Sequence, residues 1–179
     1  MLIKQAISFF MLILLGACSV TASVEELRAS IADTRSESED LLDGATNKVM
    51  SVEVILLVDR DLEKAQTRYD LHHYYLLIGR CSSSLDQNAR LQTGWETLTH
   101  RSTIKAGAKG RSSEIAFDVS LKEMKRFNEI EPYFIEATPS DFCLQAGAGA
   151  MWGATFSTNQ IPLNEPTKGS LIMLLPPPE

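Results

Sequence analysis

The clearest structural signal in the chain is the run Ser113-Glu114-Ile115-Ala116-Phe117-Asp118-Val119-Ser120. Its apolar residues Ile115, Phe117 and Val119 alternate with Glu114, Ala116 and Asp118. Successive side chains of an extended chain point to opposite faces, so this alternation predicts a β-strand with one buried face. We therefore expect a sheet that packs one side against a hydrophobic core.

A short helix is predicted directly after this strand. Ser120 and Glu123 have the Ser-x-x-Glu spacing of a capping box, in which each side chain satisfies a free amide of the first helical turn. Leu121, Met124 and Phe127 follow at helical spacing. We expect a two-turn helix whose apolar side lies on the sheet.

Further strands are expected on both sides of this unit, separated by Gly, Pro, Asn and Ser. The region Val52–Val58 is rich in β-branched residues and stops at Asp59, and residues 62–68 can form a short helical turn. Short strands with this punctuation predict a mainly β (α+β) fold, either an antiparallel sandwich or a small barrel. The other expected strands cover residues 69–78, 133–138, 142–145, 151–157 and 170–175, the last one closed by three prolines at 176–178.

The composition bounds the class of protein. With 179 residues, 44% of them hydrophobic and 22% charged, the chain has the size and balance of one globular domain with a tail. A collagen, a low-complexity coil and a polytopic membrane protein are excluded. The net charge of -6 argues against a nucleic-acid partner, because binding to phosphates requires clustered cations.

The first 17 residues have the pattern of an export signal. Lys4 precedes an apolar stretch that begins at Ala6 and reaches Ala17. A transmembrane helix needs about 20 apolar residues, so a cleaved signal peptide is favoured over a permanent span.

The end of this segment, Leu15-Gly16-Ala17-Cys18, resembles the lipobox of bacterial lipoproteins. The resemblance implies that the signal is cut before Cys18, that Cys18 carries acyl chains such as palmitate, and that Ser19 in the next position directs the protein to the outer membrane. The protein would then face the periplasm, held in the cell envelope by its lipid anchor. Ordinary cleavage near residues 20–22, with loss of Cys18, is the alternative.

Residues 18–50 are expected to form a lipidated tether with one acidic helix, ahead of a single β-rich globular domain at residues 51–179. Ser23 and Glu26 have capping-box spacing, and Gly44 is a candidate helix end. Residues 24–43 carry seven carboxylates against two arginines. A solvated spacer helix is favoured, and an acidic arm that contacts a basic partner is the alternative.

Cys81 and Cys143 remain as a pair once Cys18 is lipidated. In an oxidising periplasm an even pair of cysteines is most simply a disulfide. A catalytic thiol is the alternative, but no Cys-x-x-Cys spacing supports it.

The sequence shows no catalytic, cofactor or metal motif. It lacks the Gly-x-Ser-x-Gly nucleophile elbow and the Gly-Lys-Ser/Thr end of a P-loop. His72 and His73 are adjacent, so on a regular strand they point to opposite faces and cannot share an ion without a bulge, while His100 stands alone. We therefore expect no catalytic residue, cofactor or metal ion.

Two places are candidates for contact with a partner. Lys109 and Arg111 place cations on a Gly-rich loop, where a solvated hairpin turn is the alternative. Met151 and Trp152 stand among small residues, and Trp is enriched at binding hot spots. Trp152 equally fits a plug of the core beside the disulfide.

These features together favour a binding protein without enzymatic activity. We expect a membrane-anchored periplasmic lipoprotein that binds another protein, as immunity proteins do when they neutralise a toxic effector. A structural lipoprotein of an envelope-spanning secretion or conjugation machine is the alternative. A hydrolase with a dispersed Ser-His-Asp triad is a third hypothesis, because such a triad needs no fixed spacing.

Overall fold

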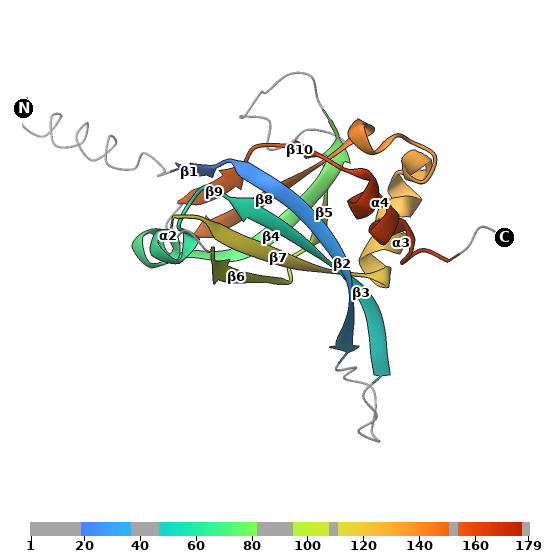
Figure 1. Ribbon diagram of the computed structural model, residues 1–179, viewed down its shortest axis with the longest axis horizontal. Helices are drawn as coiled ribbons and strands as arrows, with labels where there is room; N and C mark the ends of the chain where they lie inside the picture. The colour runs from blue at the N-terminus through green and yellow to red at the C-terminus, as the bar shows by residue number, and fades with distance from the viewer. Residues whose placement is uncertain (1–18, 37–46, 82–94, 108–110, 151–153, 177–179) are drawn as a thin grey trace, which may run out of the picture.

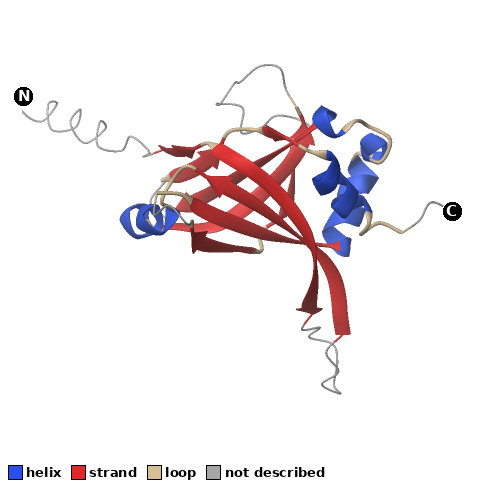
Figure 2. Cartoon of the chain, viewed as in Figure 1, coloured by secondary structure: helices blue, strands red, loops and turns tan. Residues whose placement is uncertain are grey.

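Two β-sheets packed face to face make up the body of the protein (Figures 1 and 2). The computed structural model describes residues 19–36, 47–81, 95–107, 111–150 and 154–176. The first sheet has the strand order β1-β9-β8-β4-β5, with β10 also paired to β8, and the second has the order β2-β3-β7-β6. Strands β1 and β9 run parallel, and the other pairs are antiparallel.

The chain crosses between the sheets at Ser23, whose amide donates to Asp59 Oδ1 at 2.7 Å. This crossing separates β1 in the first sheet from β2 in the second. The first sheet contains β1 (Ser19–Ala22), β4 (Leu71–Arg80), β5 (Trp95–Thr99), β8 (Phe142–Ala150), β9 (Thr155–Thr158) and β10 (Ile161–Pro162). The second contains β2 (Val24–Ser36), β3 (Asn47–Val58), β6 (Ser102–Ala106) and β7 (Ser113–Ser120).

The core lies between the sheets and follows the two-residue period of the strands. The predicted alternation of β7 is confirmed, because Ile115, Phe117 and Val119 are fully buried. The facing side chains of the first sheet are also buried, among them Leu76, Ile78, Phe142, Leu144 and Phe156. The mainly β sandwich expected from the sequence is therefore confirmed, and in the described part of the chain neither sheet closes into a barrel.

Helices cover the two ends of the sandwich. Helix α2 (Leu62–Tyr69), at the place of the predicted helical turn, lies at one end. Helices α3 (Leu121–Ile130) and α4 (Glu165–Ile172) lie at the other, together with the 3-10 turns η1 (Pro132–Phe134) and η2 (Pro139–Asp141) (Figure 1). We call this second end the helical end.

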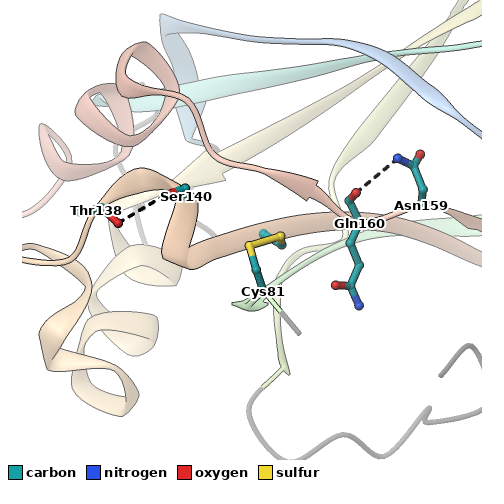
Figure 3. The surroundings of a disulfide bond; sticks show 6 residues. Cys81, Thr138, Ser140, Asn159 and Gln160 are labelled. Carbon is teal, nitrogen blue, oxygen red and sulfur yellow. Dashed lines mark hydrogen bonds between the residues drawn. A yellow bond between two sulfur atoms is a disulfide. The ribbon is translucent and has the colours of Figure 1, made fainter. Parts of the chain in front are cut away.

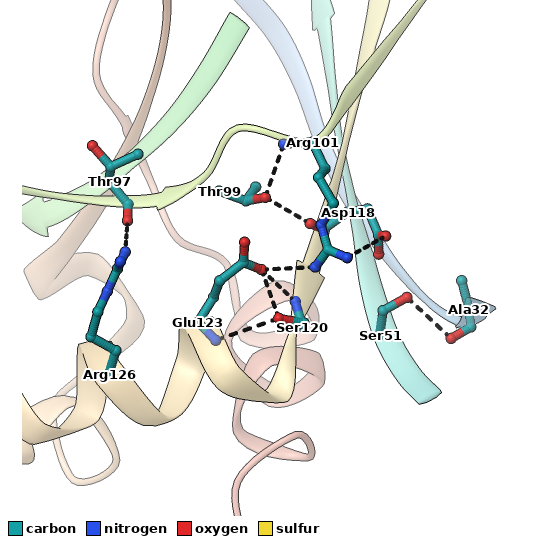
Figure 4. A network of polar contacts seen from close by, with 9 residues as sticks. All are labelled: Ala32, Ser51, Thr97, Thr99, Arg101, Asp118, Ser120, Glu123 and Arg126. Atoms are coloured by element: carbon teal, nitrogen blue, oxygen red, sulfur yellow. Dashed lines mark hydrogen bonds and ion pairs between the residues drawn. The ribbon is translucent and has the colours of Figure 1, made fainter. Parts of the chain in front are cut away.

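Helix α3 begins at the predicted capping box and is fixed to the sheets by a polar network (Figure 4). The Ser120 amide donates to Glu123 Oε2 at 2.7 Å, and the Glu123 amide donates to Ser120 Oγ at 3.4 Å. Arg101, which follows β5, donates to the same Glu123 oxygen at 3.2 Å. Arg126 of α3 donates to the carbonyl of Thr97 in β5. One carboxylate therefore joins the helix start to the connection between the two sheets.

The expected N-terminal helix is wrong, because residues 19–36 form strands β1 and β2. After a bulge near Glu26, the strand period places Leu27, Ala29 and Ile31 toward the core side. The 3-4 spacing that suggested a helix did not include Ala29, which lies between Leu27 and Ile31 at the two-residue spacing of a strand. Glu26 does not cap a helix but accepts two hydrogen bonds from Arg28, at 2.7 and 2.8 Å, and these hold the pKa of Glu26 below its usual value.

Two other predicted strands are also wrong. Residues 133–138 lie in and beside the 3-10 turns, where Pro132 and Pro139 each begin a turn. The first half of the stretch at residues 170–175 is the end of α4, and the rest is a turn; the start of α4 is capped by Asn164 Oδ1, which accepts from the Thr167 amide at 2.8 Å. Of the strand expected at residues 151–157, residues 155–157 lie in β9, and residues 151–153 fall outside the described residues.

The predicted pairing of Cys81 with Cys143 is present, with the Cα atoms 5.0 Å apart (Figure 3). The bond lies at the end of the β4–β8 ladder, where Gly79 pairs with Cys143 and the Cys81 amide donates to the carbonyl of Asp141 at 2.9 Å. It therefore fastens the end of β4 to the start of β8 beside the helical end.

Candidate protein-binding surface at the helical end

The strand register defines two opposite ends of the first sheet. Ser19 pairs with Thr155, Thr155 with Gly149, and Gly149 with His72, so these four residues form one row across the sheet. We call the end with this row the anchor end, because its Ser19 directly follows Cys18, the predicted lipidation site. Phe142, which pairs with Arg80 at the helical end, lies seven residues along β8 from Gly149. At about 3.3 Å per residue the helical end is therefore about 23 Å from the anchor end.

Large apolar side chains are exposed at the helical end. Ile130 closes α3, Tyr133 lies in η1, Ile135 follows it and Met173 ends α4, and these side chains are between 39% and 66% exposed. Exposed apolar side chains that gather in one region are characteristic of interaction surfaces. We call these four residues the apolar cap.

A shallow hollow of about 610 Å³ lies beside the apolar cap, next to the disulfide. Arg80 lies at its rim, with its guanidinium 5.8 Å from the centre of the Phe142 ring and 3.0 Å from Glu131 Oε2. Tyr133 lines the same hollow and is the most exposed member of the cap. Tyr and Arg beside a hollow are the residue types that dominate protein-binding hot spots.

The apolar cap stands on a rigid support. Phe127, Phe134 and Phe142 form an edge-to-face cluster with ring centres 5.2 to 6.0 Å apart. Lys168 of α4 is buried, lies over the Phe134 ring, and donates to the carbonyl of Ile135 at 3.0 Å and to that of Ala137. These contacts fix the segment that carries Tyr133, so the surface at the helical end is preformed.

The β2–β3 hairpin projects beyond the sandwich from the same side of the molecule as the helical end (Figure 1). Met50 lies just beyond the last pair of β3 with β7, and Ile31 lies on β2 opposite Val52, within the paired part of the sheet. Both are about half exposed, although their strand neighbours Leu27 and Val52 are buried. The apolar face of this hairpin therefore continues past the core that it helps to build. Among the described residues, the large apolar side chains that are exposed belong either to this hairpin or to the apolar cap.

Most of the residues predicted from the sequence to bind a partner cannot be compared with this surface. Lys109, Met151, Trp152 and the predicted lipidation site Cys18 fall outside the described residues. Arg111 is exposed beside the turn between β6 and β7, where the Gly107 amide donates to the carbonyl of Ser112 at 2.9 Å, so the expected hairpin is present. These predictions of partner contact stay predictions.

The sequence does not predict the surface at the helical end, because its residues come together only in the folded protein. The composition of residues 133–138 predicts a strand that includes Tyr133, and the prolines at 132 and 139 are the sequence signal against that strand. Arg80 and Phe142 are separated by 62 residues and meet only through the β4–β8 pairing.

Known proteins give no guide to this surface. Neither a family model, nor a curated protein, nor a solved structure matches the chain. Within the ranges that the structure describes, the helices are too short or too polar to cross a bilayer.

Proposed function

We propose that the protein is a lipid-anchored periplasmic lipoprotein that uses its helical end to bind and neutralise another protein, as immunity proteins neutralise toxic effectors. The observation that carries this proposal is the placement of Ser19 in β1, about 23 Å from the helical end that carries the apolar cap. An acyl chain on Cys18 holds the anchor end against the membrane without an intervening tether. The exposed apolar cap then points into the periplasm, where a soluble partner reaches it.

The shape of the helical end favours an inhibitor over a scaffold. A projecting hairpin with Met50 exposed at its base is suited to enter the cleft of an enzyme-like partner, while Tyr133 and Arg80 contact the surface around it. A structural subunit of an envelope machine is expected instead to pair through its sheet edges or through a broad flat face. The partner class is therefore a folded effector with a concave active site.

The binding surface is tested by capture of partners from envelope and secreted fractions on the domain beginning at Ser19. Tyr133→Ala and Arg80→Ala should each weaken capture about tenfold or more, as truncation of a hot-spot residue does. Arg60→Ala, an exposed residue near the anchor end, is the matched control and should leave capture unchanged.

The identity of the captured protein separates the two functions. One stoichiometric partner whose enzymatic activity stops in the complex supports the inhibitor. Several membrane-complex subunits point to the scaffold instead, and unchanged sensitivity to the toxin after deletion of the gene counts against neutralisation.

Anchoring is tested separately with Cys18→Ser. The variant should appear in the soluble periplasmic fraction, while the unaltered chain partitions with outer-membrane vesicles. Continued membrane partition of the variant refutes lipidation at Cys18, and it leaves the binding test at the helical end unaffected.

A further inference from the structure

The three histidines of the chain lie around one hollow at the open edge between the two sheets. The hollow has a volume of about 380 Å³. His72 and His73 reach it from the start of β4, and His100 reaches it from the connection that joins β5 to β6. It is also lined by Gln66, Tyr74, Ser102 and Ile104.

A bulge in β4 places both neighbouring histidines on this side. The pairing of β4 with β8 shifts register between His72 and Tyr75, and His73 has φ of 55°, in the left-handed region that non-glycine residues seldom adopt. Both imidazoles are exposed and line the same hollow, with ring centres 6.4 Å apart. The expectation that His72 and His73 point to opposite faces is therefore wrong, because the extra residue of the bulge interrupts the alternation of side chains along the strand.

His100 lines the same hollow as the other two imidazoles. Its ring centre is 6.1 Å from that of Tyr75, which follows His73 by two residues in β4. His100 and His73 are exposed, so their side chains can change rotamer. In their present rotamers no three His, Cys, Asp or Glu side chains of the described residues meet at metal-binding distance, so binding of one ion by all three imidazoles requires their rotation.

We propose that this hollow binds one divalent transition-metal ion, of the Cu²⁺, Zn²⁺ or Ni²⁺ class, through His72, His73 and His100. Its lining contains three imidazoles and no carboxylate, a donor set that suits these ions and not Ca²⁺ or Mg²⁺. The lining also contains no Lys or Arg, so it does not favour an anion at neutral pH.

One further observation points to a ligand here. His72 Nε2 lies 2.7 Å from Asp70 Oδ1, and a histidine that donates to a carboxylate in this way keeps its other nitrogen, Nδ1, available for a metal.

The proposal is tested by isothermal titration calorimetry of the full chain, purified in detergent without a histidine tag, with Zn²⁺ alone and Cu²⁺ alone. We expect one ion per chain, with Cu²⁺ bound more tightly than Zn²⁺. His73→Gln and His100→Gln should each weaken binding at least about tenfold. Asp70→Asn, which alters only the positioning of His72, should weaken it about tenfold or more without abolishing it. Glu63→Gln, an exposed carboxylate on α2, is the matched control and should have no effect.

The chain has three histidines, and all of them line this hollow. Metal binding that disappears when they are substituted therefore cannot come from another imidazole. Electron paramagnetic resonance of the Cu²⁺ complex should show nitrogen coupling that disappears in the triple Gln variant. Thermal unfolding of each variant without metal confirms that its fold is intact. Absence of binding by both ions, or binding that survives in the triple variant, overturns the proposal.

Discussion

Removal of the Cys81–Cys143 disulfide is the perturbation whose size the structure sets most directly. The bond closes a loop across a sequence separation of 62 residues. In the chain-entropy model a loop of that length lowers the entropy of the unfolded chain by about 14 cal/mol/K, which stabilises the fold by about 4 kcal/mol at 25 °C. The loop contains β5, β6, β7 and α3, so its closure restricts much of the unfolded chain.

The native structure should survive this change. The ladder from Arg80–Phe142 to Leu71–Ala150 and the Cys81 amide bond to Asp141 hold the two strands together without the bridge. Cys81→Ala with Cys143→Ala should therefore keep the near-ultraviolet circular dichroism of the folded protein. The loss should appear as a lower urea midpoint, by about 2 M for a slope near 2 kcal/mol/M.

Two comparisons make this prediction decisive. The unaltered chain in reductant should show the same midpoint as the double variant, except for about 1 kcal/mol that the missing sulfur atoms cost at buried Cys143. If the variant is unfolded in buffer, the difference is measured in an osmolyte that strengthens burial. A loss of less than about 1 kcal/mol in both comparisons refutes the loop-closure argument.

Three further predictions concern single side chains. Lys168→Ala should lower stability by about 2 to 4 kcal/mol in urea unfolding, because it removes two bonds to carbonyls and a contact with an aromatic ring; an unchanged midpoint contradicts this. Gly147→Ala should destabilise by about 1 to 3 kcal/mol, because its Cβ would lie 2.5 Å from the Tyr75 ring, while Gly149→Ala has open space and should be neutral or stabilising; equal effects of the two changes refute the clash. Burial raises the pKa of Tyr74 to about 12, so the folded state loses this proton at a higher pH than the unfolded state. The free energy of unfolding should therefore fall as pH rises from about 10 to about 12. Tyr74→Phe should remove that fall and cost little at pH 7, because the hydroxyl has no partner among the described residues; a variant that keeps the full alkaline loss excludes Tyr74 as its source.

Elements whose signals lie within a few residues were predictable. Strand β7 and helix α3 follow from the alternation of Ile115, Phe117 and Val119 and from the capping box at Ser120. The strand has the expected bounds, and the helix begins where expected but continues to Ile130, beyond the two turns predicted. Strand β2 did not follow, since its extended form depends on pairing with β3, for example Leu27 with Leu56. Long-range pairing of this kind overrides the local preference of a polar, acidic segment for a helix.

The end of the chain shows a different limit. Asn164 and Pro166 are start signals for α4, but the apolar residues after them also fit a strand, and periodicity alone does not separate the two over so short a run. The bulge at His73 had no local signal, because it arises from the way β4 pairs with β8. The sequence alone therefore does not predict that the three histidines line one hollow.

The amino-acid sequence by itself determined the mainly β class and the pairing of Cys81 with Cys143. It also predicts an export signal with a lipobox, which stays a prediction. Each of these depends on residue type and short spacing. The division of the molecule into an anchor end and a helical end came from the fold, through pairings such as Ser19 with Thr155. Residues so distant in the chain become neighbours only when the core between the sheets is buried, because that burial fixes the strand register.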